Sequence, residues 1–285
     1  MNYYVVIPAH NEQQFLSFTL DSLLRQTLLP KRVIIVNDNS TDETENIIDS
    51  YTSEHSLFTK LNTTSDTLHM PGSKVVNAFK KGLALLDEDY DFLVKLDADI
   101  VLPDPYFEKI ALAFRANPNI GIAGGFAYEE DAKGIWKRNH PMNNDHVRGA
   151  FKAYSKRCFK DIGGLKSVMG WDTVDELLAR YHGYEIHTDE NLHAKHLRPV
   201  GNAYNKKAKL LQGKAMYGMR YGYLITLIAS LKMALKQRKK NAFFDNMEGY
   251  LEAERNNAAF LVSEAEGKYI RKLRWTNMRK KLLPF

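Results

Sequence analysis

Short apolar runs alternate with segments of helical periodicity along the first 130 residues of the chain. The apolar runs are nearly continuous and rich in β-branched residues, as expected for strands that are covered on both faces. Strands are predicted at Tyr3–Ile7, Arg32–Val36, Phe92–Leu96 and Ile120–Tyr128, and helices at Asn11–Leu24, Thr41–Tyr51, Ser73–Leu86 and after Asp104-Pro105. This alternation is typical of βα units that form a mostly parallel sheet, so we expect an α/β fold.

The pattern changes after this first part. Residues Glu129–Val147 are polar and aromatic without a period, which predicts a loop or flap. A helix is predicted at Thr173–His182, where Gly183 ends it, and a short strand at Tyr184–His187. Beyond about Gly201 the pattern is helical and basic, with no strand signal.

We therefore expect a boundary near residue 200. Residues 1–200 would form one α/β domain. Residues 201–285 would form a helical, basic C-terminal region.

Composition narrows the class of protein. Hydrophobic residues at 44% and charged residues at 26% are ordinary for a globular protein of 285 residues. The single cysteine, Cys158, excludes an intramolecular disulfide and a cysteine-cluster metal site, which favours a reducing compartment. The N-terminus resembles a first strand, not a signal peptide, and the longest uncharged apolar run, Tyr221–Leu231, has 11 residues where a bilayer span needs about 20. We expect a cytoplasmic protein.

The net charge of +6 is concentrated in one region, because no Asp or Glu occurs between Asn191 and Phe244. Tyrosines and an apolar core are interleaved with lysines and arginines at residues 216–240. This pattern fits an interfacial helix at the inner face of a membrane, and equally a helix that packs on the catalytic domain with a solvated basic face. No nucleic-acid reading motif is present, so we expect no nucleic-acid partner.

The sharpest local motif is Asp97-Ala98-Asp99, which directly follows an apolar strand. The carboxyl ends of parallel strands border the ligand crevice of an open α/β sheet. Two carboxylates at i and i+2 could address one divalent cation and the diphosphate that it bridges, and oxygen ligands suit Mg²⁺ or Mn²⁺. The alternative is a polar turn in which the aspartates only cap the backbone.

Four motifs in order resemble the nucleotide-sugar-binding half of family-2 glycosyltransferases. They are Ile7-Pro8-Ala9-His10-Asn11-Glu12, Val36-Asn37-Asp38-Asn39-Ser40-Thr41-Asp42, Gly72-Ser73-Lys74 with Asn77, and Asp97-Ala98-Asp99. The resemblance covers roughly residues 3–200 and implies a GT-A fold. Residues 1–200 would then be the catalytic domain, with a nucleotide-sugar-binding half at 1–100 and an acceptor-binding half at 101–200. The resemblance further implies an inverting, metal-dependent transfer from a nucleotide-diphosphate sugar to a hydroxyl of a glycan or lipid-linked acceptor, in cell-surface polysaccharide or glycolipid synthesis.

The resemblance also assigns nucleotide-sugar-binding residues. Those in the four motifs are Pro8, His10, Asn11, Asp38, Lys74, Asn77, Asp97 and Asp99. Asp38 would accept the imide N–H of uracil, which favours a UDP-sugar, although Asn37 and Asn39 depart from the usual Asp-Asp-Gly-Ser. Asp99 would ligate Mg²⁺ or Mn²⁺, with His196 as a further metal or diphosphate ligand and His193 as the competing choice.

An acceptor hydroxyl needs a general base, because its pKa lies far above 7. The base is expected at the start of the helix after Gly170, where Asp172 precedes Gly183-Tyr184 by the 11 residues typical of the family. Trp171 replaces the usual Glu there, and Asp175 is the alternative base. Trp171 and Trp136 could stack on sugar rings.

Three other classes of protein are alternatives to a glycosyltransferase. A nicotinamide dehydrogenase needs Gly-x-Gly-x-x-Gly after the first strand, and a nucleotidylyltransferase needs a Gly-rich phosphate loop there. The chain has neither, because Pro8-Ala9-His10-Asn11 occupies that position. A non-catalytic subunit that binds nucleotide-sugar or a partner enzyme stays open, since Asn37, Asn39 and Trp171 depart from the family pattern.

Overall fold

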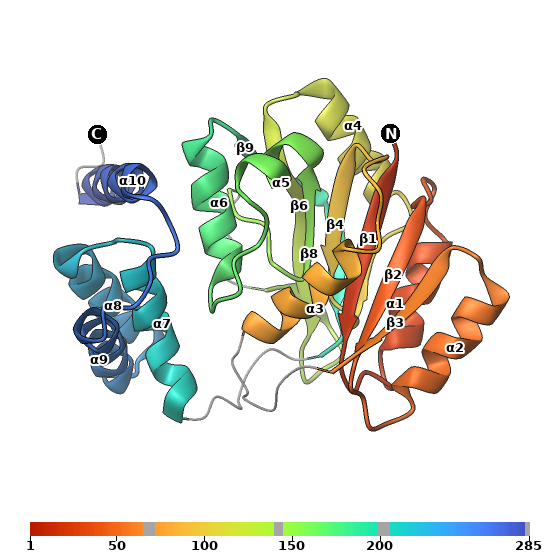
Figure 1. The fold of residues 1–285 in the computed structure, drawn as a ribbon, viewed down its shortest axis with the longest axis horizontal. Helices are drawn as coiled ribbons and strands as arrows, with labels where there is room; N and C mark the ends of the chain where they lie inside the picture. Colours follow the sequence, from red (N-terminus) through yellow and green to blue (C-terminus); the bar gives the residue numbers. More distant parts are fainter. Residues whose placement is uncertain (65–71, 140–144, 199–205, 283–285) are drawn as a thin grey trace.

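The protein was analysed as a computed structural model, which describes residues 1–64, 72–139, 145–198 and 206–282 (Figure 1). One nine-stranded sheet has the strand order β3-β2-β1-β4-β8-β6-β9-β5, and β7 pairs with β6. The strands are β1 Tyr3–Ala9, β2 Arg32–Asp38, β3 Phe58–Thr63, β4 Phe92–Leu96, β5 Ile100–Val101, β6 Ile120–Glu130, β7 Trp136–Arg138, β8 Phe151–Ser155 and β9 Glu185–His196. The helices are α1 Leu16–Leu24, α2 Thr44–Glu54, α3 Ser73–Leu83, α4 Tyr106–Ala116, α5 Lys156–Asp161, α6 Trp171–Tyr181, α7 Lys206–Gly218, α8 Tyr223–Gln237, α9 Asn241–Arg255 and α10 Glu264–Leu282.

The N-terminal half is the parallel layer that the sequence predicts. β3, β2, β1 and β4 pair in parallel, and their apolar side chains form the core of the domain. Figure 1 shows α3 in front of this layer and α1 behind it. Helix α3 comes very close to the sheet at Gly82, where a Cβ would lie 2.6 Å from Val6 Cγ1. Because β1, β2 and β4 run parallel to one another, their carboxyl ends lie along one edge of the sheet.

The second half of the sheet is mixed and departs from the predicted elements. The first helix begins at Leu16 and not at residue 11, because Asn11 has a left-handed backbone (φ 55°). The predicted loop at 129–147 contains the end of β6 and the strand β7, which pair as antiparallel neighbours. The predicted short strand at 184–187 is the start of the 12-residue β9, so His196 ends a strand instead of following one.

Besides β7, four elements lacked a sequence signal. β3, β5 and α5 are short or polar, and in β8 the apolar run is interrupted by Lys152, whose side chain is completely buried. A buried lysine breaks the hydrophobic pattern on which strand prediction depends.

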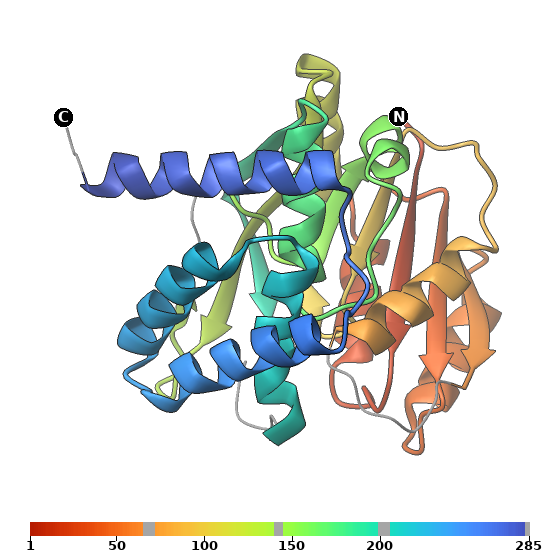
Figure 2. The same ribbon diagram turned by 60° about the vertical axis from the view of Figure 1, so that its left-hand side comes forward.

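Helices α7–α10 follow the sheet and pack beside it (Figure 2). Helices α7 and α9 touch backbone to backbone, since a Cβ on Gly213 would lie 1.9 Å from the Asn246 carbonyl oxygen. Helix α10 contacts α6, which packs on strands β6 and β9 of the sheet. Among the described residues, no helix has both the length and the apolar character needed to cross a bilayer. The expected boundary near residue 200 falls in 199–205, outside the described residues.

Candidate active site

The loops after β1 and β2 form one wall of the candidate site. His10 Nδ1 lies 2.7 Å from the Asp38 carbonyl oxygen, and Asn11 Oδ1 accepts a hydrogen bond of 2.8 Å from the Thr41 backbone N–H. These contacts join the two strand ends. Asp38 is buried, and in the described part of the chain its Oδ1 has no hydrogen-bond partner. A buried carboxylate oxygen without a donor is costly, and a ligand N–H would satisfy it.

Asn37, which departs from the family pattern, has a structural role in this wall. Its Nδ2 donates to Asn62 Oδ1 on β3 at 3.0 Å, and its Oδ1 accepts from the Ser40 N–H at 3.3 Å. Both ends of the amide are therefore used within the protein. Asp38 is left as the acidic group of this loop that can meet a ligand.

Asp97 and Asp99 lie between β4 and β5 and have different environments. Asp97 forms an ion pair with Lys95 and is partly exposed, with 32% of its side chain accessible. Asp99 is buried, and its Oδ2 lies 3.2 Å from His196 Nε2. The antiparallel pairing of Ile100 with His196 places this histidine beside Asp99. Asp99 and His196 are thus brought together from positions nearly 100 apart in the chain.

Three further charged groups surround Asp99 and His196. Glu12 Oε2 and Arg198 form an ion pair of 2.5 Å, and Arg198 Nε lies 3.9 Å from Asp99 Oδ2. Glu129 Oε1 lies 3.6 Å from His196 Nδ1. Burial raises the pKa of Glu12 to about 7, with the charge of Arg198 opposing this shift. Burial alone would lower the pKa of His196, but the hydrogen bond and charge of Asp99 raise it overall.

The start of α6 lies on the other side of Asp97. The Asp97 N–H donates to the Ala150 carbonyl at 2.7 Å, and the adjacent Gly149 packs on α6, because a Cβ there would lie 3.2 Å from Asp172 Cβ. The ring of Trp171 lies 5.2 Å from Lys95 Nζ and is buried, so it stacks on a lysine of the protein. Asp172, in the first turn, is partly exposed.

Asp175 belongs to a buried charge cluster beneath the same helix. Its Oδ1 lies 2.8 Å from Lys152 Nζ, and its Oδ2 accepts a hydrogen bond of 2.5 Å from the Tyr154 hydroxyl. Glu176 Oε1 lies 3.0 Å from the same Nζ, and His146 Nδ1 lies 3.0 Å from its Oε2. The charges of Asp175 and Glu176 outweigh the effect of burial and raise the pKa of Lys152 to about 12. Burial raises the pKa of Asp175, whereas Lys152 outweighs burial at Glu176 and lowers its pKa.

The remaining candidates are spread over α3, β7 and β9. Asn77 Oδ1 accepts from Ser167 Oγ at 2.6 Å, so this helix is tied to the segment before α6, while Lys74 is partly exposed. His193 packs on Tyr128 with tilted rings whose centroids lie 4.2 Å apart. Trp136 lies under Lys195 Nζ at 5.1 Å. Pro8 is partly exposed at the end of β1.

A divalent cation fits Asp99 and His196. Asp99 Oδ2 and His196 Nε2 converge to 3.2 Å, whereas the other ring nitrogen, Nδ1, lies on the side of Glu129. In the described part of the chain, no group of three or more His, Cys, Asp or Glu side chains could hold a metal ion by itself. Two protein ligands suit Mg²⁺ or Mn²⁺, because such ions usually keep waters and substrate phosphate oxygens in their coordination shell.

Sequence reasoning assigned no role to Glu12, Glu129, Arg198, Lys95 or Lys152. Glu12 stands in the first motif and Arg198 two residues after His196, so proximity in sequence could have found both. The surroundings of Glu129, Lys95 and Lys152 depend on pairings between strands that are distant in the sequence. Lys152 and Lys95, on the neighbouring strands β8 and β4, flank the Trp171 ring at 5.9 and 5.2 Å.

Comparison with known proteins gives the fold and the family. The chain is 24% identical over 268 residues to the uncharacterized glycosyltransferase MG025 of Mycoplasma genitalium, a match that covers 85% of this chain and 86% of the relative. S. aureus TarS residues 1–349, solved in complex with UDP-GlcNAc, has a TM-score of 0.56 at 19% identity over 77% of this chain and 65% of that one. Mannosyltransferase PcManGT of Pyrobaculum calidifontis, solved with GDP-Man and Mn²⁺, has a TM-score of 0.57 at 16% identity over 99% and 81%.

These likenesses confirm the predicted α/β fold of the GT-A type. The Glycosyl transferase family 2 model matches residues 4–168, more than half of the chain. This match confirms the resemblance that the sequence motifs indicate. The protein is an enzyme of the glycosyltransferase type that uses a nucleotide-sugar donor, and the chain belongs to glycosyl transferase family 2.

Proposed function

We propose that the protein is a metal-dependent, inverting glycosyltransferase that moves a sugar from a UDP-sugar to a hydroxyl of a glycan or lipid-linked acceptor. The observation that carries the proposal is the pairing of Asp99 with His196 beside Asp97, whose N–H is bonded to Ala150 next to the Gly149 that packs on Asp172. Asp38 ends β2, which is separated from β4 by β1 in the sheet. Among the described residues, the buried Asp38 Oδ1 has no hydrogen-bond partner, as expected of a group that waits for a ligand. Cell-surface polysaccharide or glycolipid synthesis is the process that we propose for this activity.

The donor would lie across the ends of β1, β2 and β4. Asp38 Oδ1 would accept the uracil imide N–H, and the polar groups of Pro8, His10 and Asn11 would border the base and ribose. Lys74, at the start of α3, would face the base or phosphates. Asn77 is tied to Ser167, so it would act on the donor through the position of α3. Asp97, partly exposed and paired with Lys95, would accept a ribose or sugar hydroxyl.

Asp99 and His196 would hold Mg²⁺ or Mn²⁺ at the diphosphate. Such a cation neutralises the charge that develops on a leaving diphosphate. Arg198, whose guanidinium lies 3.9 Å from Asp99 and pairs with Glu12, would add positive charge on the same side. The electrostatic stabilisation of the leaving group would therefore come mainly from this side of the site.

Asp172 is the base that we propose, in preference to Asp175. A base must reach the acceptor hydroxyl, and Asp172 is partly exposed beside Gly149. Asp175 is buried, and both of its oxygens are bonded within the protein, to Lys152 and Tyr154. In-line attack by the deprotonated hydroxyl on the anomeric carbon, with departure of the diphosphate from the opposite face, would invert the configuration.

We further propose that residues 216–240 contact an anionic membrane on the cytoplasmic side. On α8, Leu224, Ile228, Leu231 and Leu235 are spaced by 4, 3 and 4 residues, and all four are exposed. Lysines and arginines at the end of α8 and beyond it would meet anionic headgroups. The protein should sediment with anionic vesicles at low salt and detach as salt rises. Leu224→Ser with Leu235→Ser should weaken this binding, and the exposed Leu112→Ser on α4 should not. Absence of vesicle binding at low salt would leave α8 as a packed helix only.

Titration of the purified protein with a panel of UDP- and GDP-sugars, with and without Mn²⁺, tests the main proposal. We expect Mn²⁺-dependent binding of a UDP-sugar and its consumption when an acceptor is supplied. Donor binding without turnover across an acceptor panel would support the alternative, a non-catalytic nucleotide-sugar-binding subunit. Binding of no nucleotide-sugar at all would contradict both.

A further inference from the structure

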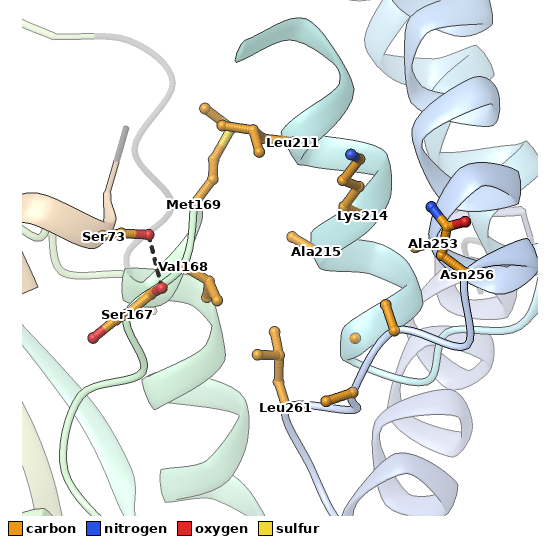
Figure 3. A pocket seen from close by; sticks show the side chains of 13 residues that line it. Ser73, Ser167, Val168, Met169, Leu211, Lys214, Ala215, Ala253, Asn256 and Leu261 are labelled. Carbon is orange, nitrogen blue, oxygen red and sulfur yellow. Dashed lines mark hydrogen bonds between the residues drawn. The ribbon is translucent and has the colours of Figure 1, made fainter. Parts of the chain in front are cut away.

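A cavity of about 250 Å³ lies between the catalytic domain and the C-terminal helices (Figure 3). One wall consists of Ser73, at the start of α3, and the segment that ends at Met169. The other wall consists of α7 and the chain after α9, including Ala215 and Leu261. The two walls belong to segments far apart in the sequence, so the cavity exists only because the helices pack on the catalytic domain.

We propose that this cavity binds a linear hydrocarbon chain, and that the chain is the apolar part of the acceptor. The identity of the chain as part of an acceptor rests on the proposed function. The binding of a hydrocarbon does not, because it depends only on the shape and chemistry of the cavity.

Most of the lining is apolar, and the polar side chains at its edge largely have partners. Ser73 Oγ donates to the Ser167 carbonyl at 2.8 Å, as Figure 3 shows, and Ser167 Oγ is bonded to Asn77. Lys214 Nζ is paired with Glu252 at 2.7 Å. A buried water needs two to four polar partners, and besides these groups the lining adds one polar side chain, Asn256. An apolar ligand would therefore be favoured over water.

Each wall is internally close-packed, which limits how far its own parts can shift into the cavity. On the helical side, a Cβ on Gly249 would lie 2.1 Å from the Leu210 carbonyl oxygen, so α7 and α9 are already in backbone contact. On the catalytic side, Gly72 packs on the Val168 carbonyl, where a Cβ would lie 2.6 Å away. The small side chain of Ala215, between these fixed points, leaves the space open.

The cavity is continuous with the segment that positions the proposed base. Met169 lines the cavity, and Asp172 follows three residues later, after the left-handed Gly170 (φ 72°). Three residues span at most about 11 Å when fully extended. A hydrocarbon in the cavity can therefore keep its polar end close to Asp172. The segment is also bonded to α3 through Ser167, which connects the cavity with the donor side.

The volume of the cavity sets how strongly the affinity should depend on the length of the hydrocarbon chain. The cavity equals roughly eight times the ~30 Å³ that a water molecule occupies in the liquid, and a methylene group is of similar size. Each methylene that becomes fully buried is expected to tighten binding about threefold to fourfold. An octyl chain should therefore bind far more tightly than a methyl group on the same headgroup.

The binding test uses octyl and methyl β-D-glucopyranoside, which share a sugar and differ in the aglycone. The protein is labelled with ¹³C at its methionine methyl groups, and Met169→Leu assigns the Met169 signal. Octyl glucoside below its micelle concentration should shift this signal, and methyl glucoside at equal concentration should not. Ala259→Leu, at an exposed position that lines the cavity, should weaken octyl glucoside binding at least tenfold. Ala116→Leu, an exposed alanine at the end of α4, is the matched control and should leave binding unchanged.

Two results would overturn the hydrocarbon site. One is a Met169 signal that octyl glucoside does not move, which would show that the cavity closes or stays empty in solution. The other is a shift of the same size and affinity in Ala259→Leu, which would show that the glycoside binds elsewhere.

The assignment to the acceptor is tested with the donor that the nucleotide-sugar panel selects. Donor consumption is measured with pairs of methyl and octyl glycosides of several sugars. Wherever a sugar is used, the octyl member should have a KM at least tenfold lower, and Ala259→Leu should abolish this preference. Equal KM values would overturn the acceptor assignment. A Met169 shift in a protein that consumes no donor with any glycoside would contradict the proposed function and leave the hydrocarbon site standing.

Discussion

Two groups of acidic side chains lie near each other in this molecule and differ in how they are satisfied. At the edge of the sheet, Asp38 Oδ1 has no hydrogen-bond partner among the described residues, and Asp99 lies beside His196 and Arg198. Beneath α6, Asp175 and Glu176 are saturated by Lys152 and the side chains around it. A carboxylate that awaits a ligand differs from a structural one in its partners, not in its residue type. The first group is expected to control activity and the second to control stability.

The largest expected effect is the loss of Asp99. Asp99→Ala should remove the carboxylate that holds the cation. The activation free energy of transfer should rise by about 4 kcal/mol, so the rate should fall roughly a thousandfold. EDTA should have the same effect on the wild-type protein. The thermal unfolding midpoint of the variant checks that the fold is intact. Full activity in EDTA would contradict the metal role of this group.

Asp172 and Asp175 lie within one turn of α6, but we expect the first to act in catalysis and the second to belong to the structural group. Asp172→Asn should lower transfer by about 10² to 10⁴, the usual contribution of general base catalysis, with nucleotide-sugar affinity nearly unchanged. Asp175→Asn should lower the unfolding midpoint but leave the turnover of the folded protein within a few-fold. Single-turnover rates and donor titrations of both variants show which of the two aspartates is the base. A dead Asp175→Asn beside an active Asp172→Asn would reverse the assignment.

Lys152 offers the strongest test of the structural group. Lys152→Met would leave Asp175 and Glu176 as uncompensated buried charges and should lower the free energy of unfolding by about 3–5 kcal/mol. Lys156→Met, which removes an exposed pair with Glu88, should cost no more than about 1 kcal/mol. Urea denaturation compares the two. Adding Asp175→Asn and Glu176→Gln to Lys152→Met should recover part of the loss, since the unpaired charges are then gone.

The sequence predicts the sheet-edge group far better than the buried group. Apolar runs identify β1, β2 and β4, and the polar motifs at their ends follow directly, so Asp38 and Asp99 could be found without a structure. Lys152 and its partners could not, because a lysine inside a strand is read as an exposed residue. The approach of His196 to Asp99 depends on β5 and β9, of which one is two residues long and the other is mostly polar. Such pairings are set by the whole sheet and leave no local signal.

The smallest predicted effect distinguishes Asp38 from its neighbour Asn37. Asp38→Asn exchanges a charge-assisted hydrogen bond to the uracil imide for a neutral one, which is weaker by about 1 kcal/mol and lowers the affinity for UDP about fivefold to tenfold. The affinity for GDP should change less, because guanine does not present this imide to the same oxygen.

Asn37→Asp supplies the matched control, since it restores the acid that the family pattern has at this position. The Asn37 amide donates to Asn62 and accepts from Ser40, so a carboxylate there would lose its donor and place two acceptor oxygens face to face. We expect this variant to reduce the free energy of unfolding by about 1–3 kcal/mol and to leave UDP affinity within twofold. Calorimetric titration with UDP and urea denaturation of both variants measure the two effects. If Asn37→Asp instead tightened UDP binding, the base would be read by both positions, and Asp38 would no longer stand alone as the acidic ligand of this loop.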